Sequence, residues 1–151
     1  MSAGSVAVTD FVLEEALYIR RVVEGEIERE PVDLVPLIAS GALTIFSADS
    51  EAELQTFIDL TVDLDDGEAM TAALAIHRGC VLVTDDRKAE RLLAGRVQLR
   101  ATLELMRDWA RTEGVAADEV RAALTGVYER GYQAPTRHPL KSWWDAAITA
   151  Q

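Results

Sequence analysis

The chain has 151 residues but only one cysteine, Cys80, and two histidines, His77 and His138. One cysteine excludes an intramolecular disulfide, and the few cysteines and histidines do not follow the spacing of a zinc site. Cys80 directly precedes the apolar run 81–83. We therefore expect a small, half-buried thiol at this position rather than a nucleophile.

Long apolar segments are also lacking. The first residues, MSAGSVAVTDFVLEE, contain no basic region and no extended apolar stretch, and no window approaches the length that spans a bilayer. Internal repeats and low-complexity tracts are absent from the sequence as well. With 49% apolar residues, the chain is expected to form one globular domain in the cytoplasm, without a membrane partner.

Basic residues are scarce in the first part of the chain. Residues 1–86 carry 4 basic and 18 acidic groups, residues 87–111 carry 7 and 3, and residues 112–151 carry 4 and 5. Such an acidic protein repels nucleic acid at long range, so a polyanionic partner would require a local basic surface or a bound cation. The basic segment directly follows the neighbouring aspartates Asp85 and Asp86.

Hydrophobic periodicity predicts strands that alternate with helices. Such alternation favours an α/β fold with a small, mostly parallel sheet flanked by helices. Thr9 or Asp10 is expected to cap the first helix, and Asp49 or Ser50 the second. The predicted strands cover residues 6–8, 42–46, 81–84 and 97–101, and the predicted helices cover 11–23, 51–62, 67–79, 87–95, 102–114, 117–132 and 141–150.

Asp85 and Asp86 stand at a predicted strand end. In α/β sheets, ligands bind beyond the carboxyl ends of the strands, so this position favours a functional role. Aspartate also caps helices well, and helix capping is the expected role of one member of the pair. Capping does not explain both.

Two glutamates are further candidates. Glu68 opens a helix after Gly67, on a face of small residues, and its placement equally suits the helix dipole. If residues 11–23 are helical, Glu15 shares a face with Phe11, Tyr18 and other apolar residues, whereas Glu14 lies on a more solvated face. A carboxylate among apolar groups is costly unless a cation pairs with it.

Carboxylates without cysteine or histidine favour hard cations, Mg²⁺ or Mn²⁺. These metals activate water and polarise phosphoryl oxygens, so an acidic protein that binds them could cleave a phosphodiester. The basic residues after Asp86 would then contact the flanking phosphates, although a solvated helix face is the simpler interpretation of Arg91. The expected phosphate contacts are Arg87, Lys88, Arg96 and Arg100.

Three segments carry a family resemblance. VTDFVLEEAL, LDDGEAMTAALAIHRG and VLVTDDRKAERLL resemble, in this order, the PIN-domain ribonucleases, which include VapC-type toxins of toxin-antitoxin pairs. The resemblance extends to about Met106 and is closest to the subgroup with a Gly-Glu-Ala helix start and an Asp-Asp strand end. It implies a three-layer sandwich in one domain over residues 1–151, with a helical C-terminal part over 102–151.

The resemblance also implies a metal site of four acidic residues. Glu15 matches the second acid, Glu68 the third and Asp86 the fourth, with Asp85 beside it as support or alternative ligand. Thr84 matches a small hydroxyl residue of the family.

The first acid of the family ends a strand that precedes the first matching segment. The chain is expected to begin after that strand. Asp10 is a weaker candidate for the first acid, because using it would leave VLEE without a match.

The resemblance implies an endoribonuclease that uses Mg²⁺ or Mn²⁺, with RNA as substrate and an antitoxin protein and a second copy of the chain as possible partners. The alternative is a catalytically incomplete PIN-like module that binds RNA or protein. A phosphorylatable receiver domain fits less well, because no later predicted strand ends in aspartate. We expect His77 to be a helix C-terminal residue, and Trp143 and Trp144 to dock the last helix onto the core.

Overall fold

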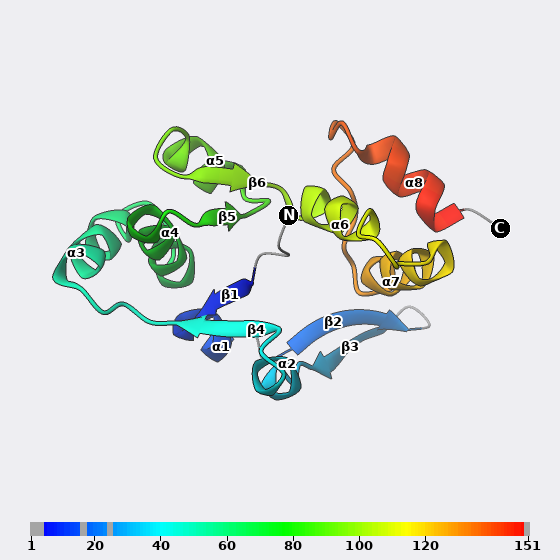
Figure 1. The fold of residues 1–151 in the computed structure, drawn as a ribbon, viewed down its shortest axis with the longest axis horizontal. Coiled ribbons are helices and arrows are strands. Elements are labelled where there is room, and N and C mark those ends of the chain that lie inside the picture. Colours follow the sequence, from blue (N-terminus) through cyan, green and yellow to red (C-terminus); the bar gives the residue numbers. More distant parts are fainter. Residues whose placement is uncertain (1–4, 16–17, 24–25, 150–151) are drawn as a thin grey trace. The chain divides into compact units, whose positions relative to one another are not determined.

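The computed structural model describes residues 5–15, 18–23 and 26–149. The fold is mixed α/β, as the sequence predicts (Figure 1). Strands of the described residues are β1 (Val6–Thr9), β2 (Tyr18–Val23), β3 (Glu26–Pro31), β4 (Leu43–Phe46), β5 (Val81–Val83) and β6 (Gln98–Arg100). Helices are α1 (Asp10–Glu15), α2 (Val35–Ala39), α3 (Glu51–Leu60), α4 (Asp66–Arg78), α5 (Arg87–Leu93), α6 (Thr102–Ala110), α7 (Ala117–Glu129) and α8 (Lys141–Thr149).

The chain forms two compact units. Unit 1 combines Met1–Leu17 with Pro31–Arg100, and unit 2 combines Tyr18–Glu30 with Ala101–Gln151. The helical C-terminal part predicted over 102–151 contributes α6, α7 and α8 to unit 2. No helix within the described residues is both long enough and apolar enough to cross a membrane.

The strands of unit 1 form two parallel pairs. β1 pairs with β4, with Val6 opposite Leu43, and β5 pairs with β6, with Leu82 opposite Leu99. The predicted strands over 6–8, 42–46, 81–84 and 97–101 are thus confirmed, and so is parallel pairing. Among the described strands the sheets are two-stranded, whereas the sequence predicts one small sheet.

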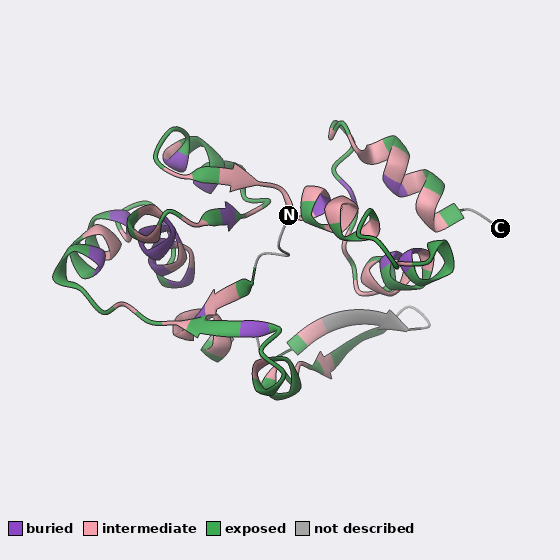
Figure 2. Cartoon of the chain, viewed as in Figure 1, coloured by how far each residue is buried: buried purple, intermediate pink, exposed green. Residues whose placement is uncertain are grey.

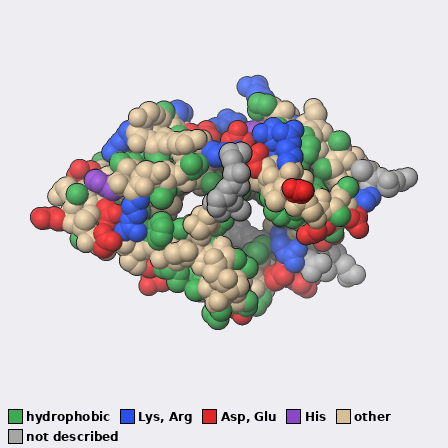
Figure 3. Space-filling view, in the orientation of Figure 1, with side chains coloured by type: hydrophobic (Ala, Val, Ile, Leu, Met, Phe, Trp, Pro, Cys, Tyr) green, Lys and Arg blue, Asp and Glu red, His purple; other side chains and the backbone are tan. Residues whose placement is uncertain are grey.

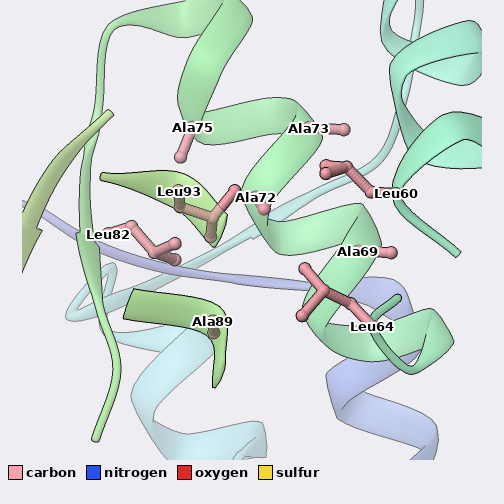
Figure 4. Close-up of a cluster of buried hydrophobic side chains, with 9 residues drawn as sticks. All are labelled: Leu60, Leu64, Ala69, Ala72, Ala73, Ala75, Leu82, Ala89 and Leu93. Carbon is pink, nitrogen blue, oxygen red and sulfur yellow. The ribbon is translucent and has the colours of Figure 1, made fainter. Parts of the chain in front are cut away.

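The core of unit 1 surrounds α4. Alanines give this helix two narrow faces, so that neighbouring elements can approach it closely. Figure 4 shows Ala69 and Ala73 on the side of Leu60 and Leu64 of the α3 region, and Ala72 and Ala75 on the side of β5 and α5. Leu82, Ala89 and Leu93 fill this second side. The helix ends at Gly79, whose φ of 64° is the left-handed conformation that glycine adopts readily.

A buried ion pair ties α3 to the end of α4. Glu53 is only 3% exposed and accepts hydrogen bonds from the Nε of Arg78 at 2.8 Å and from the amide of Asp49 at 2.9 Å. Ser50 caps α3 by accepting a hydrogen bond from the Glu53 amide. The Arg78 guanidinium, followed by the Asp49 amide, lowers the pKa of Glu53 to about 2. Glu53 is therefore ionised in the folded protein at neutral pH.

Unit 2 has a separate apolar core. Leu103, Leu124 and Trp144 are almost completely buried, and Trp144 packs edge-on against Tyr132 at 5.4 Å between ring centroids. Trp143 is partly buried against the same cluster. The prediction that the tryptophans dock the last helix onto its own core is confirmed.

Unit 2 also contains β2 and β3, which pair with each other. Arg130, the residue after α7, forms an ion pair with Glu30 of β3 at 2.9 Å. The predicted helix over 11–23 is confirmed for residues 11–15, which belong to α1, and is wrong for residues 18–23, because the β-branched and aromatic residues of YIRRVV form a strand. The predicted cap at its start is confirmed, because the Thr9 hydroxyl accepts a hydrogen bond from the Val12 amide.

Candidate functional site

The first part of the candidate site is the start of α4. The side chain of Asp65 caps this helix by accepting a hydrogen bond from the Glu68 amide at 2.8 Å. Glu68 consequently lies in the first turn, where it is half-buried. The sequence DDGE encodes this arrangement, because aspartate is a good N-cap and the helix dipole favours acidic residues in the first turn.

The second part is the connection between β5 and α5. The amide of Thr84 donates to the carbonyl of Arg100 at 3.0 Å, and its hydroxyl accepts from the amide of Asp86 at 3.1 Å. Asp86 caps α5, since its Oδ1 accepts hydrogen bonds from the amides of Lys88 at 2.7 Å and Ala89 at 2.8 Å. Asp86 is thus the member of the aspartate pair that caps the helix, and one of its carboxylate oxygens is engaged in the cap.

These two helix starts lie close enough for their charges to interact. Partial burial raises the pKa of Glu68, and repulsion by the carboxylates of Asp65 and Asp86 raises it further. Hydrogen bonding from the Asp65 backbone and attraction by Lys88 oppose this rise. The Nζ of Lys88 donates to the carbonyl of Asp63. Asp65, Glu68 and Asp86, here called the acidic group, are therefore crowded with like charge, and one ammonium lies nearby.

The acidic group fits a magnesium site in part. Its ligand atoms would be carboxylate oxygens, the donors that Mg²⁺ and Mn²⁺ prefer. However, the parts of the chain that the structure describes contain no set of three or more acidic, histidine or cysteine side chains arranged to hold a metal ion. Mg²⁺ often takes one or two carboxylates together with waters and substrate phosphates. Glu68 and Asp86 fit this open type of site rather than a closed cage.

The apolar helix face predicted around Glu15 does not form. That face requires Tyr18, Ile19 and Val22 to continue the helix of Glu15, but these residues belong to β2 in unit 2. Glu15 is the last residue of α1, and its side chain lies outside the described residues. A ligand role for Glu15 thus rests on the family resemblance alone.

The structure also describes the surroundings of Asp10, the weaker candidate for the first acid, and of Asp85, the neighbour of Asp86. Asp10 opens α1 directly after β1, and its Oδ1 accepts a hydrogen bond from the Phe11 amide at 3.1 Å. Asp85 is exposed beside Asp86. The charge of Asp86 is one of the causes that raise the pKa of Glu68.

Three of the four expected phosphate contacts lie at the carboxyl end of the β5 and β6 pair. Arg96 lies at the opposite end, because Val81, the first residue of β5, pairs with Gln98, two residues after Arg96. Arg87 and Lys88 are exposed in the first turn of α5, and Arg96 is exposed in the connection that follows this helix. Arg100 ends β6 and is half-buried. Arg91 is exposed in the last turn of α5, as the interpretation as a solvated helix face predicts.

The histidines have local structural roles. His77 hydrogen-bonds through Nε2 to the Thr56 hydroxyl at 2.8 Å, which links the end of α4 to α3. The Nδ1 of His138 accepts a hydrogen bond from the Leu140 amide at 3.1 Å. Cys80 is partly buried, as predicted.

One member of the acidic group is not predicted from the sequence. Asp65 precedes α4, but the effect of its charge on the pKa of Glu68 becomes evident only in the structure. The signal is present in the spacing, because a residue that caps a helix through the third following amide brings its carboxylate to the first turn.

Comparison with known proteins gives no relative. No protein-family model, curated protein or solved structure matches the chain.

Proposed function

We propose that this chain is a PIN-type ribonuclease that cleaves RNA phosphodiesters with Mg²⁺ or Mn²⁺ at the acidic group. The observation that carries the proposal is the setting of Glu68, whose pKa is raised first by partial burial and then by the charges of Asp65 and Asp86. A bound cation relieves the repulsion between like charges at a half-buried carboxylate, and carboxylates with perturbed pKa values occur preferentially at functional sites. The family resemblance gives Glu68 and Asp86 their expected roles as metal ligands.

Each residue would have a distinct task. Glu68 and Asp86 would hold the cation, which supplies polarisation of a phosphoryl oxygen and activation of a water. The Asp86 oxygen engaged in the cap would keep this carboxylate oriented. Exposed Arg87 and Lys88, in the first turn of α5, would contact phosphates beside the cleaved bond.

A second candidate function is a PIN-like module that binds RNA without cutting it. The described residues include no three-ligand metal set, and Lys88 already offsets part of the charge on Glu68. A fixed ammonium could take the place of the cation. In this case the basic residues near Asp86 would provide binding alone.

Calorimetric titration of Mn²⁺ separates the candidates. The chain would be compared with Glu68→Gln and Asp86→Asn, both of which keep the shape of the side chain; asparagine also retains the helix cap. Glu90→Gln, in an exposed position of α5, is the matched control. Saturable binding that both site variants weaken by about tenfold or more, with the control unchanged, is the result expected of a metal enzyme.

The other results are equally specific. Absence of Mn²⁺ binding together with retained binding of single-stranded RNA would favour the non-cleaving module. A chain that binds neither Mn²⁺ nor single-stranded RNA would reject both candidate functions.

A further inference from the structure

The outer side of α3 carries an apolar stripe that is exposed in the part of the chain that the structure describes. Leu54, Ile58 and Val62 follow one another at intervals of four residues and are 46%, 56% and 82% exposed. Residues four apart lie on the same side of a helix, so the first two share a face of α3 and Val62 follows at its end. We call these three residues the outer stripe. Single exposed apolar residues are common, but a continuous row marks an interaction surface.

The inner side of α3 packs against the core of unit 1 and holds the helix in place. Leu60 is buried in the core around α4, and Phe57 packs against that core and lies 5.6 Å from Phe11 between ring centroids. In Figure 2, exposed residues occupy the part of α3 that points away from α4. The outer stripe is therefore not needed to hold α3 in place.

The surroundings of the outer stripe are acidic. Residues 49–66 contain seven acidic residues and no basic residue. Of these, Glu51, Asp59 and Asp63 are exposed beside the outer stripe and form what we call the acidic border, whereas Glu53 is neutralised by Arg78. Figure 3 shows acidic side chains gathered over the region of α3.

These charges select among possible occupants. A second copy of the chain would bring an identical acidic border against the first, and like charges across an interface are unfavourable. A basic partner would be attracted, and its apolar residues would remove the outer stripe from water. The ammonium of Lys88 bonds to the Asp63 carbonyl at one end of the acidic border, and Asp59 accepts a hydrogen bond from the side-chain amide of Gln55 at 3.0 Å.

We propose that the outer stripe and the acidic border bind an amphipathic basic helix of a partner protein. Such a helix presents apolar residues at helical spacing to the stripe, and its lysines or arginines meet Glu51, Asp59 and Asp63. The inference is independent of RNA cleavage, because none of these residues belongs to the acidic group.

A peptide-binding measurement on the full chain tests this proposal. The probe is a fluorescein-labelled amphipathic helix of leucine and lysine, about 18 residues long, equivalent to five turns. Its comparison peptides are a scrambled sequence of the same composition, which lacks an apolar face, and a leucine-glutamate peptide with the same face. Fluorescence anisotropy is expected to show binding at least about tenfold tighter for the probe than for either comparison peptide.

Matched protein variants locate the surface. Leu54→Ser with Ile58→Ser is expected to weaken probe binding at least about tenfold. Val35→Ser with Leu37→Ser makes the same kind of change at α2 residues of 68% and 47% exposure and should change binding less than about twofold. Both pairs lie at the surface, and circular dichroism verifies that each variant remains folded.

Three results would overturn the proposal. One is failure of the parent chain to bind the probe, and another is equal weakening in both double variants. The third is concentration-dependent dimerisation of the parent chain in sedimentation that Leu54→Ser with Ile58→Ser abolishes, because the outer stripe would then be covered by a second copy.

Discussion

Glu68 is the residue whose properties depend most directly on the acidic group. Burial and the charges of Asp65 and Asp86 raise its pKa, so the folded state holds the proton of Glu68 more tightly than the unfolded state does. The contribution of Glu68 to stability is therefore fully present at low pH and is lost as the pH rises through the raised pKa. A cation at the acidic group would favour the ionised form of Glu68 and would therefore oppose this loss of stability at higher pH.

Replacing Asp86 by asparagine is expected to lower the pKa of Glu68. The substitution removes one repelling charge but keeps a side-chain oxygen for the cap of α5. Carbon-detected NMR titration of the glutamate carboxyls measures this pKa directly. Glu90→Gln is the control and should leave it unchanged, and a Glu68 pKa equal to that of the parent in Asp86→Asn would contradict the proximity of the two carboxylates.

The contribution of Glu53 to stability is expected to depend on pH in the opposite way. Its pKa of about 2 lies below the ordinary value of 4.5, so its stabilising effect is present above pH 4.5 and is lost as the pH falls toward 2. Glu53→Gln should lower the unfolding temperature at neutral pH. As the pH falls, this variant should lose less of its stability than the parent does. Thermal unfolding followed by circular dichroism from pH 7 to 2 tests this, with exposed Glu51→Gln as the control on the same helix.

At the scale of elements, α4 depends on its alanines. Ala72 is completely buried against the side that holds β5 and α5, so a larger side chain forces these elements apart. Ala72→Leu is expected to reduce the free energy of unfolding by about 1–3 kcal/mol. Urea denaturation gives the value, and Ala52→Leu, at an exposed position of α3, should change it by less than about 0.5 kcal/mol. Equal effects in both variants would show that α4 is not closely packed.

The sequence predicts α4 well and residues 18–23 poorly, for physical reasons. Asp65 and Gly79 mark the two ends of α4 with a good cap and a left-handed stop, and these signals are local. YIRRVV has apolar residues at positions that suit a helix as well as a strand, and its pairing with β3 depends on later residues. The apolar face predicted for Glu15 depends on that helix, so an error in an element becomes an error in the candidate site.

At the scale of the whole molecule, acidic and basic residues are concentrated in different segments of the chain, and this affects how RNA can bind. The acidic residues before Arg87 repel a polyanion, so RNA binding would depend on a few basic side chains near Asp86. We expect Arg87→Gln with Lys88→Gln to weaken binding of single-stranded RNA. The slope of log affinity against log salt should become shallower by about 0.7 for each phosphate that is no longer neutralised. Arg137→Gln, an exposed change in unit 2, is the control, and equal weakening in this variant would contradict a localised basic surface.

Cleavage of RNA tests the proposed function of the whole molecule most directly. A labelled pool of random-sequence, single-stranded RNA would be incubated with the parent chain, Glu68→Gln and Glu90→Gln in Mn²⁺, and with the parent in a chelator. We expect cleavage by the parent and by Glu90→Gln in Mn²⁺, no cleavage in the chelator, and a rate lower by at least about a hundredfold in Glu68→Gln. Cleavage that persists at the parent rate in Glu68→Gln, or a parent chain that cuts no RNA in Mn²⁺, would contradict a metal-dependent ribonuclease at the acidic group.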